Sequence, residues 1–189
     1  REDDERLSTN DISKFLQHML ERIDFKKDLH FYTNTTIDTL DYSGDGLNAG
    51  SKVVFAAAGD KKRELMTVLP LSFNLPPDFD SFKIAIPGVL ALKANKYQDA
   101  ISAKKEIELL KSHLKSEDLA TLQLIVVCDD AEFTAANINN LVWIAFTRSN
   151  PAADIDGVDD FMVNKHWGCN GPLIIDARKK PHHAPELIK

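Results

Sequence analysis

The chain has 189 residues, of which 43% are hydrophobic and 28% charged, and its formal net charge is −6. This length and composition predict one compact domain, or one domain plus an arm, with enough chain to bury a sizeable core. The negative charge argues against a nucleic-acid surface and against docking on anionic membranes, both of which need an excess of lysine and arginine. No apolar stretch approaches the roughly 18 residues of a membrane span, and the first residues lack the apolar region of a signal peptide. Two cysteines, Cys128 and Cys169, are too few for a disulfide framework, so we expect a cytoplasmic protein with reduced thiols.

The chain is predicted to begin with a helical arm. Candidate capping residues occupy positions 8–11, and apolar residues recur at helical spacing over residues 12–23. Residues 31–42 are rich in β-branched and aromatic types and are interpreted as extended. We therefore expect a helical arm and extended connector over residues 1–45 and an α/β domain over residues 46–189. The apolar stripe of the arm has no obvious partner within the chain and consists of Ile12, Phe15, Leu16, Met19, Leu20 and Ile23.

Short apolar runs and two helical patterns alternate in the rest of the chain. The run at residues 122–128 is nearly continuous, which is typical of a strand covered by helices on both faces. Residues 96–115 predict an amphipathic helix, and residues 135–147 predict a buried helix, apolar almost all round, with Thr134 as its N-cap. This order predicts an α/β fold, a three-layer sandwich with a largely parallel or mixed sheet, preceded by the helical arm. The remaining apolar runs are residues 53–56, 82–86 and 173–175.

Residues 43–50 contain a match to the G-x-G-x-x-A dinucleotide fingerprint, which requires a helix to follow the loop. A strand-like run, residues 51–55, follows instead. The same stretch imitates a calcium loop through Asp41 and Asp45, but its twelfth position is Lys52, a cation where the ion needs a bidentate glutamate. The glycines therefore indicate a turn rather than a ligand site.

The other chemistry-bearing residues form incomplete patterns. Cys169 lies three residues after His166, but a zinc site needs two such pairs, and Cys128 ends an apolar run. No arrangement of serine, histidine and acid suggests a hydrolase triad. A late acidic cluster lacks the spacing of a metal loop and predicts a solvated turn, and it consists of Asp154, Asp156, Asp159 and Asp160.

Asp129 and Asp130 follow the most apolar run directly. Ligands of open α/β sheets gather outside the carboxyl ends of the strands, so the pair is placed where chemistry is common. The two carboxylates could bind Mg²⁺, cap the following helix or pair with Arg148. The residues alone leave these alternatives open.

Three ordered segments carry a family resemblance. An apolar strand ends in Cys-Asp-Asp, a helix ends in Thr-Arg and is followed by Pro-Ala-Ala-Asp, and a late strand leads into Asp-Ala-Arg-Lys. Together they resemble the C-terminal domain of the UbiD family of decarboxylases, which includes 3-polyprenyl-4-hydroxybenzoate carboxy-lyase. The resemblance covers about residues 120–180, whereas residues 1–80 match poorly and are interpreted as a lineage-specific elaboration. The segments are residues 124–130 (LIVVCDD), 141–154 (LVWIAFTRSNPAAD) and 171–180 (GPLIIDARKK).

The resemblance places Asp129 and Asp130 on the first two acidic positions of the family's Cys-Asp-Asp-Asp motif. A lysine is common in the family where this chain has Pro172. If that lysine reaches toward the cofactor phosphate, Lys165 or Lys179 would have to replace it, and these two are the predicted cofactor-binding residues. Further departures, from Asp, Asp, Arg and Thr in the family, are Ala131, Asn150, Ala153 and Arg178.

The resemblance also implies an activity. It implies a lyase, a non-oxidative decarboxylase of aromatic or α,β-unsaturated carboxylic acids of the quinone-biosynthesis type. By the same resemblance, prenylated FMN, a divalent metal (Mn²⁺ or Mg²⁺) and the catalytic residues belong to the N-terminal and middle parts of a longer polypeptide. We therefore expect this chain to be a C-terminal domain that forms a wall of the site and a homo-oligomer interface, next to the N-terminal flavin-binding part. We expect it to have no catalytic or metal-ligating residues, to bind no cofactor alone and to be inactive alone; its start at Arg1 favours an excised domain.

Two other classes of function remain open. A non-catalytic α/β oligomerisation or scaffold module would use the unpartnered stripe of the arm as its interface. A Mg²⁺-dependent phosphate-handling domain would be built on Asp129 and Asp130, with a lysine or threonine at another strand end.

Overall fold

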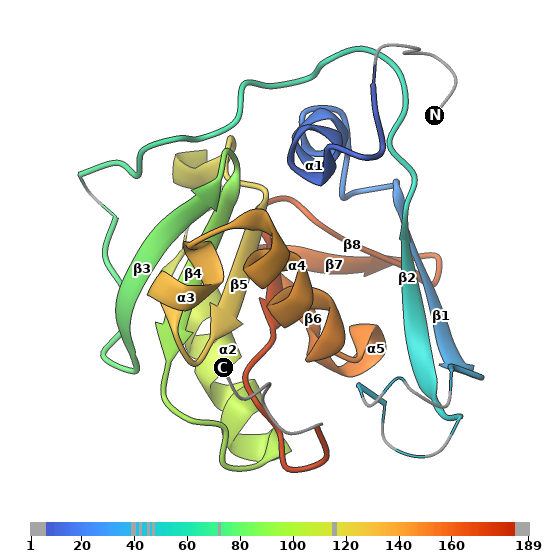
Figure 1. Ribbon diagram of the computed structural model, residues 1–189, viewed down its shortest axis with the longest axis vertical. Helices are drawn as coiled ribbons and strands as arrows, with labels where there is room; N and C mark the ends of the chain where they lie inside the picture. The colour runs from blue at the N-terminus through green and yellow to red at the C-terminus, as the bar shows by residue number, and fades with distance from the viewer. Residues whose placement is uncertain are drawn as a thin grey trace.

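The computed structural model describes residues 7–38, 41, 43–44, 46, 48–71, 73–114 and 117–183. A five-stranded mixed sheet lies at the centre of the molecule, in the order β3-β4-β5-β9-β6 (Figure 1). The three middle strands are parallel, and the two edge strands run antiparallel to their neighbours. The predicted α/β sandwich is therefore confirmed, with a mixed sheet. Its strands are β3 (Phe79–Ile86), β4 (Val89–Ala94), β5 (Leu124–Cys128), β6 (Ile155–Gly157) and β9 (Leu173–Asp176).

The central strand β5 is buried along its whole length between β4 and β9. Successive side chains of a strand point to opposite faces. Val126 accordingly lies in the core on one face of the sheet, and Ile125 and Val127 lie in the core on the other. Because both faces are covered, every position must be apolar, which explains the continuous hydrophobic pattern of this segment.

Helices cover both faces of the sheet. On the Ile125 face lies α2 (Ala100–His113), whose N-terminus is capped by Asp99. The Val126 face is covered by α3 (Ala131–Ala135) and α4 (Ile138–Thr147). The short helices α5 (Pro151–Asp154) and η1 (Glu117–Leu119) complete the connections. None of the helices in the described part of the chain is long and apolar enough to cross a membrane.

The helix predicted over residues 135–147 differs from the structure in two ways. Thr134 is not its N-cap, because it lies inside α3 and donates its hydroxyl to the carbonyl oxygen of Asp130 at 2.7 Å. The cap of α4 is Asn137, whose side chain accepts the N–H of Asn140 at 2.9 Å and so begins a second helix. The expectation of burial all round is also wrong, since Phe146 is 51% exposed.

The N-terminal arm packs on the core of the same chain. Helix α1 (Ile12–Leu20) is capped by Asp11. Its apolar stripe places Leu20, and beyond the helix Ile23, in the same buried cluster as Val126 of the central strand. The C-terminal end of the stripe therefore has a partner within the chain, contrary to what its spacing alone suggested, whereas Leu16 and Met19 are only partly buried.

Two antiparallel ribbons lie beside the sheet, at the right of Figure 1. The first joins β1 (Leu29–Thr35) to β2 (Gly50–Phe55), and the second joins β7 (Asp160–Val163) to β8 (His166–Cys169). Phe31 of β1 meets Trp167 of β8 edge to face, with 5.5 Å between ring centroids, so that the ribbons support each other.

Candidate functional site

The three segments that carry the family resemblance meet at the carboxylate of Asp129. This residue follows β5, and its Oδ2 pairs with the guanidinium of Arg148, beyond the end of α4, at 3.2 Å. The same oxygen accepts the backbone N–H of Lys179, which lies beyond β9, at 2.8 Å. Parallel strands end at a common edge of the sheet, which explains why segments so distant in sequence converge.

The second aspartate has a different role. Asp130 is the N-cap of α3, where its Oδ1 accepts the N–H of Phe133 at 2.9 Å. Of the alternatives left open by the sequence, one aspartate thus makes the ion pair and the other makes the cap. Among the described residues, no three His, Cys, Asp or Glu side chains come together in a way that could hold a metal ion.

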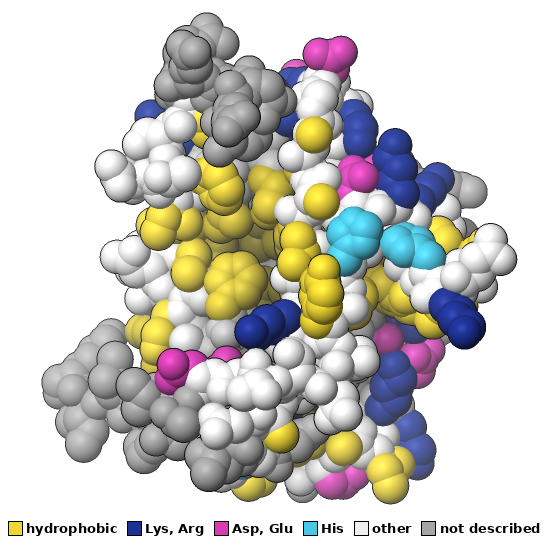
Figure 2. Space-filling view, turned by 90° about the vertical axis from the view of Figure 1, so that its right-hand side faces the viewer, with side chains coloured by type: hydrophobic (Ala, Val, Ile, Leu, Met, Phe, Trp, Pro, Cys, Tyr) yellow, Lys and Arg dark blue, Asp and Glu magenta, His cyan; other side chains and the backbone are white. Residues whose placement is uncertain are grey.

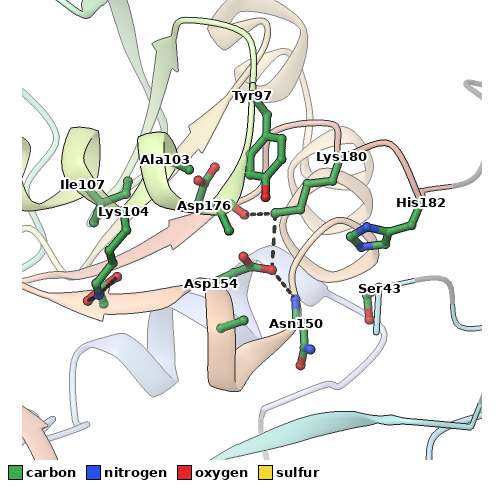
Figure 3. A pocket seen from close by; sticks show the side chains of 13 residues that line it. Ser43, Tyr97, Ala103, Lys104, Ile107, Asn150, Asp154, Asp176, Lys180 and His182 are labelled. Carbon is green, nitrogen blue, oxygen red and sulfur yellow. Dashed lines mark hydrogen bonds and ion pairs between the residues drawn. The ribbon is translucent and has the colours of Figure 1, made fainter. Parts of the chain in front are cut away.

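Lys180 extends the junction to α5. Its Nζ donates to the carbonyl oxygens of Asp176 and Arg148, at 2.9 and 3.1 Å, and lies 3.2 Å from Oδ2 of Asp154 (Figure 3). Burial raises the pKa of the Asp154 carboxyl, although Lys180 and the N–H of Asn150 oppose the rise. Nothing in the sequence marks Lys180 as a site residue, because a lysine in a basic run shows no sign of burial.

Arg178 forms the most buried part of the junction. Its guanidinium makes two hydrogen bonds to the carboxylate of Asp176, pairs with Glu106 of α2 and donates to the carbonyl oxygen of Asn95. By the resemblance, Arg178 stands where family members typically have threonine. The charge of this larger side chain is met by acceptors from β9, from α2 and from Asn95 after the end of β4.

A cavity of about 300 Å³ opens beside this network (Figure 3). Tyr97, Asp154, Lys180 and His182 supply polar groups to its wall, and α2 supplies apolar residues such as Ile107. Burial raises the pKa of the Tyr97 phenol, and nearby carboxylates add to the rise. The three N–H groups of Lys180 already meet three oxygens, and one of these belongs to Asp154, whose charge balances that of the lysine. The raised pKa of Tyr97 keeps its phenol neutral, so the cavity is lined by an uncharged phenol and a balanced ion pair.

A larger pocket of about 840 Å³ is lined by Arg148 and by residues of α3 and α4. The guanidinium carbon of Arg148 lies 4.9 Å from the ring centroid of Trp143, a cation–π contact. Phe133, Asn137 and Asp129 also contribute to the wall. Arg148 therefore lines the larger pocket with its side chain, and its carbonyl oxygen accepts a hydrogen bond from Lys180, which lines the smaller cavity.

The two predicted cofactor-binding lysines stand on separate elements. Lys165 is exposed in the turn between β7 and β8, with φ 66°, and borders a pocket of about 780 Å³ beside His166 and Trp167. Lys179 is exposed at the carboxyl end of β9. Their assignment to a cofactor phosphate stays a prediction.

The acidic cluster is only partly the solvated turn that the sequence predicts. Asp159 and Asp160 are exposed. Asp156 is buried and pairs with Lys104 at 2.7 Å, and Asp154 holds Lys180. The prediction is wrong for these two residues because lysines supplied by distant segments neutralise them, and spacing does not reveal such partners.

The remaining sequence patterns have structural roles in the described residues. A strand, β2, does follow the glycine-rich stretch at residues 43–50, as expected for a turn; Asp45 lies outside the described residues. Both cysteines are buried with free thiols. Burial raises the pKa of Cys128 and raises that of Cys169 to about 12, so neither is a reactive thiolate.

The fold and the junction define an α/β domain whose polar residues gather at the carboxyl edge of its parallel strands. A family model described as the C-terminal domain of 3-octaprenyl-4-hydroxybenzoate carboxy-lyase matches residues 3–57. The chain is also 30% identical over 186 residues to a Chlamydia pneumoniae protein whose name makes it part of a 4-hydroxybenzoate decarboxylase, and the match covers 97% of this chain and 30% of that protein. This chain is a UbiD C-terminal-like domain.

Two uncharacterized chlamydial proteins show the same coverage. The similarity spans 186 residues in both, with 29% identity to the protein of Chlamydia trachomatis and 30% identity to that of Chlamydia muridarum. In each case it covers 97% of this chain and 30% of the relative. The chain thus spans less than a third of the length of these relatives.

The position of the family match corrects one expectation. Residues 1–80 were expected to match poorly, yet the family model matches residues 3–57, which include α1 and the β1–β2 ribbon. The expectation was wrong because this part contributes apolar packing rather than polar motifs. The arm and the ribbon therefore belong to the family's domain and are not a lineage-specific elaboration.

Proposed function

We propose that this chain is the C-terminal domain of a prenylated-flavin-dependent, non-oxidative decarboxylase of aromatic or α,β-unsaturated carboxylic acids. The observation that carries the proposal is the convergence of the three motif segments on Asp129. The family description and the name of the Chlamydia pneumoniae relative support carboxy-lyase chemistry on 4-hydroxybenzoate-type acids. We extend the proposal to the quinone-biosynthesis type of substrate.

The described residues do not by themselves fit a divalent metal. Asp129 is paired with Arg148, Asp130 caps α3 and Asp176 is paired with Arg178, so these carboxylates already have partners. We therefore assign the metal, the flavin and the catalytic groups to the rest of a longer polypeptide, and no step of the reaction to this chain.

The contribution of this chain is a wall of the site. A rigid wall that excludes water protects a carbanion-like intermediate from its surroundings, and a domain that closes over the substrate can supply it. The network of Asp129, Arg148 and Lys180 suits this role, because it fixes the ends of β5, α4 and β9 relative to one another. A homo-oligomer interface formed by the same domain is part of the proposal.

The test compares the longer polypeptide with the 189-residue chain, both supplied with prenylated flavin and Mn²⁺. We expect CO₂ release from aromatic acids by the longer polypeptide only. Turnover by the 189-residue chain alone would overturn the division of roles, and no release by the longer polypeptide would overturn the activity.

A matched pair of variants tests the junction in the longer polypeptide. Asp129→Asn keeps an acceptor for the N–H of Lys179 but loses the charge opposite Arg148, and we expect it to slow decarboxylation at least tenfold. Asp80→Asn removes an exposed carboxylate paired with Lys93 on the edge hairpin and should leave the rate unchanged. Equal rates for the two variants would contradict a role for the junction.

The competing hypothesis of a non-catalytic oligomerisation or scaffold module has lost its main support. It relied on the apolar stripe of the arm having no partner, but Leu20 and Ile23 are buried in the core of the same chain. The phosphate-handling alternative likewise lacks a cluster of three or more His, Cys, Asp or Glu side chains among the described residues that could hold its metal.

A further inference from the structure

An apolar hollow opens on the side of the molecule where α1, β2 and α4 surround a gap in the outer layer. Figure 2 shows hydrophobic side chains gathered in this depression, left of its centre. The three elements contribute apolar side chains that pack against the buried core and remain only partly buried themselves. These are Leu16 and Met19 of α1, Val53 and Phe55 of β2, and Trp143 of α4.

The strand β2 shows why the described residues leave the hollow uncovered. At its start, Ser51 accepts the N–H of Ala152 at 2.7 Å, which fastens this end of the strand to α5. Val53 and Phe55 follow at intervals of two and so point to the same side of the strand as Ser51. Helix α5 has only four residues, Pro151–Asp154, and the strand runs on past it. The apolar face of β2 therefore continues beyond the element that covers its beginning.

The hollow differs from the scattered apolar residues found on every protein surface. Met162 on β7 is such a residue, 65% exposed at the edge of a two-stranded ribbon. In Figure 2, by contrast, hydrophobic side chains gather in one depression, and the partly buried apolar residues of α1, β2 and α4 pack against the core. Contiguous apolar surfaces of this kind mark places where a protein, a membrane or a ligand is bound.

We propose that this hollow receives a segment of the longer polypeptide that lies outside this chain and presents bulky apolar side chains. The inference rests on the proposed function, in which the chain is one domain of that polypeptide. Two of the three walls, α1 and β2, lie within residues 3–57, the part matched by the C-terminal domain of a carboxy-lyase. The chain covers only 30% of each relative, so most of such a polypeptide lies outside it and can supply the occupant.

The experiment measures thiol accessibility in the longer polypeptide and in the 189-residue chain. Met19→Cys places a thiol at the hollow, and Met162→Cys places a matched thiol on β7 away from it. The native thiols Cys128 and Cys169 are buried, and mass spectrometry assigns each modified peptide. We expect Met19→Cys to react at least tenfold more slowly in the longer polypeptide than in the 189-residue chain, and Met162→Cys to react equally in both.

The other outcomes are decisive as well. Equal rates for Met19→Cys in both proteins would overturn the proposal, and so would protection in the 189-residue chain that grows with its concentration, because a second copy would then fill the hollow. Val53→Cys repeats the measurement should Met19→Cys disturb α1.

Decarboxylation by the longer polypeptide is assayed separately from thiol accessibility. CO₂ release with an accessible thiol at the hollow refutes only the docking, and a protected thiol without CO₂ release refutes only the proposed activity.

Discussion

Arg178 and Asp176 form a two-point ion pair at the carboxyl end of β9. Nε of the arginine lies 2.9 Å from Oδ1 of the aspartate, and Nη2 lies 2.8 Å from Oδ2. Burial alone would lower the pKa of the guanidinium, but Asp176 and Glu106 outweigh it and hold that pKa above its ordinary value. A fully buried cation is thus kept charged by acceptors on both sides, in the geometry that suits arginine and not lysine.

Removing this arginine should therefore be costly. Arg178→Met leaves Asp176 and Glu106 without their partner, and we expect a loss of about 3–5 kcal/mol in the free energy of unfolding. Arg178→Lys keeps the charge but loses the two parallel hydrogen bonds to Asp176, so its free energy of unfolding should lie between that of Arg178→Met and that of the wild type. Lys105→Ala removes an exposed cation from α2 and should change stability by less than about 0.5 kcal/mol. Urea unfolding measures all three, and an Arg178→Met loss as small as that of Lys105→Ala would refute the buried pair.

The central strand supplies a second prediction. Ile125 is fully buried in β5, and Ile125→Ala should cost about 2–5 kcal/mol because it leaves a cavity in a core that cannot fully relax. The matched control is Ile101→Ala on α2, where the side chain is 71% exposed and little stability depends on it. Thermal unfolding of the two variants gives the comparison. Equal melting temperatures would show that β5 is not the interior strand of the sheet.

The pH dependence of stability should depend on His183. Its Nδ1 accepts the N–H of Lys180 at 3.1 Å, while its buried Nε2 has no hydrogen-bond partner among the described residues. Burial, reinforced by the charge of Lys180, lowers the pKa of the imidazole from 6.5 to about 4. Between pH 6.5 and pH 4, His183 is protonated in the unfolded state but stays neutral in the folded state. The free energy of unfolding therefore falls as the pH is lowered from about 6.5 toward 4.

This effect can be separated from other acid titrations with a variant. His183→Asn keeps an acceptor near the position of Nδ1 and does not titrate. We expect its stability to fall less than that of the wild type over this range, by on the order of 1–3 kcal/mol. His182→Asn, at an exposed neighbour, should keep most of the wild-type decline. Parallel curves for His183→Asn and the wild type in urea titrations from pH 7 to 4 would contradict the assignment.

The thiols should be unreactive in the folded protein. Burial raises the pKa of Cys128 and raises that of Cys169 to about 12, and only the thiolate attacks a disulfide reagent. We expect both to react with an aromatic disulfide at pH 8 at least a hundredfold more slowly than in urea. A fast phase of one thiol in the native chain would show that a cysteine is accessible.

The sequence predicted the parts of the fold that depend on one strong local pattern. The continuous apolar run at β5 identified an interior strand, and the helical spacing in α1 and α2 placed both helices within a few residues. Strand β4 was missed, although Lys93 is its only polar residue. The strand follows β3 through Pro87 and Gly88, and the φ of 79° at Gly88 is a left-handed conformation that favours glycine in a tight turn.

The candidate site was predictable only in part. Asp129 and Asp130 could be singled out because two carboxylates after an apolar strand are unusual. The sequence also offered the ion pair with Arg148 as one of the possible roles of this aspartate pair, and the structure shows that Asp129 forms it. The burial of Lys180 and Arg178 could not be predicted, because it depends on Asp154 of α5 and Glu106 of α2, which are distant in sequence. Tertiary contacts of that kind leave no periodic trace in a sequence.

The place of β9 in the sheet has a consequence for the order in which the protein can assemble. This strand is among the last described residues of the chain, yet it lies between β5 and β6. During synthesis, one edge of β5 stays unpaired until residues 173–176 have left the ribosome. Helix α1 is made first, so the core surface on which it packs is completed only long afterwards. This connectivity makes the pairing of β5 with β9 a late, non-local step of folding, which slows closure of the interior.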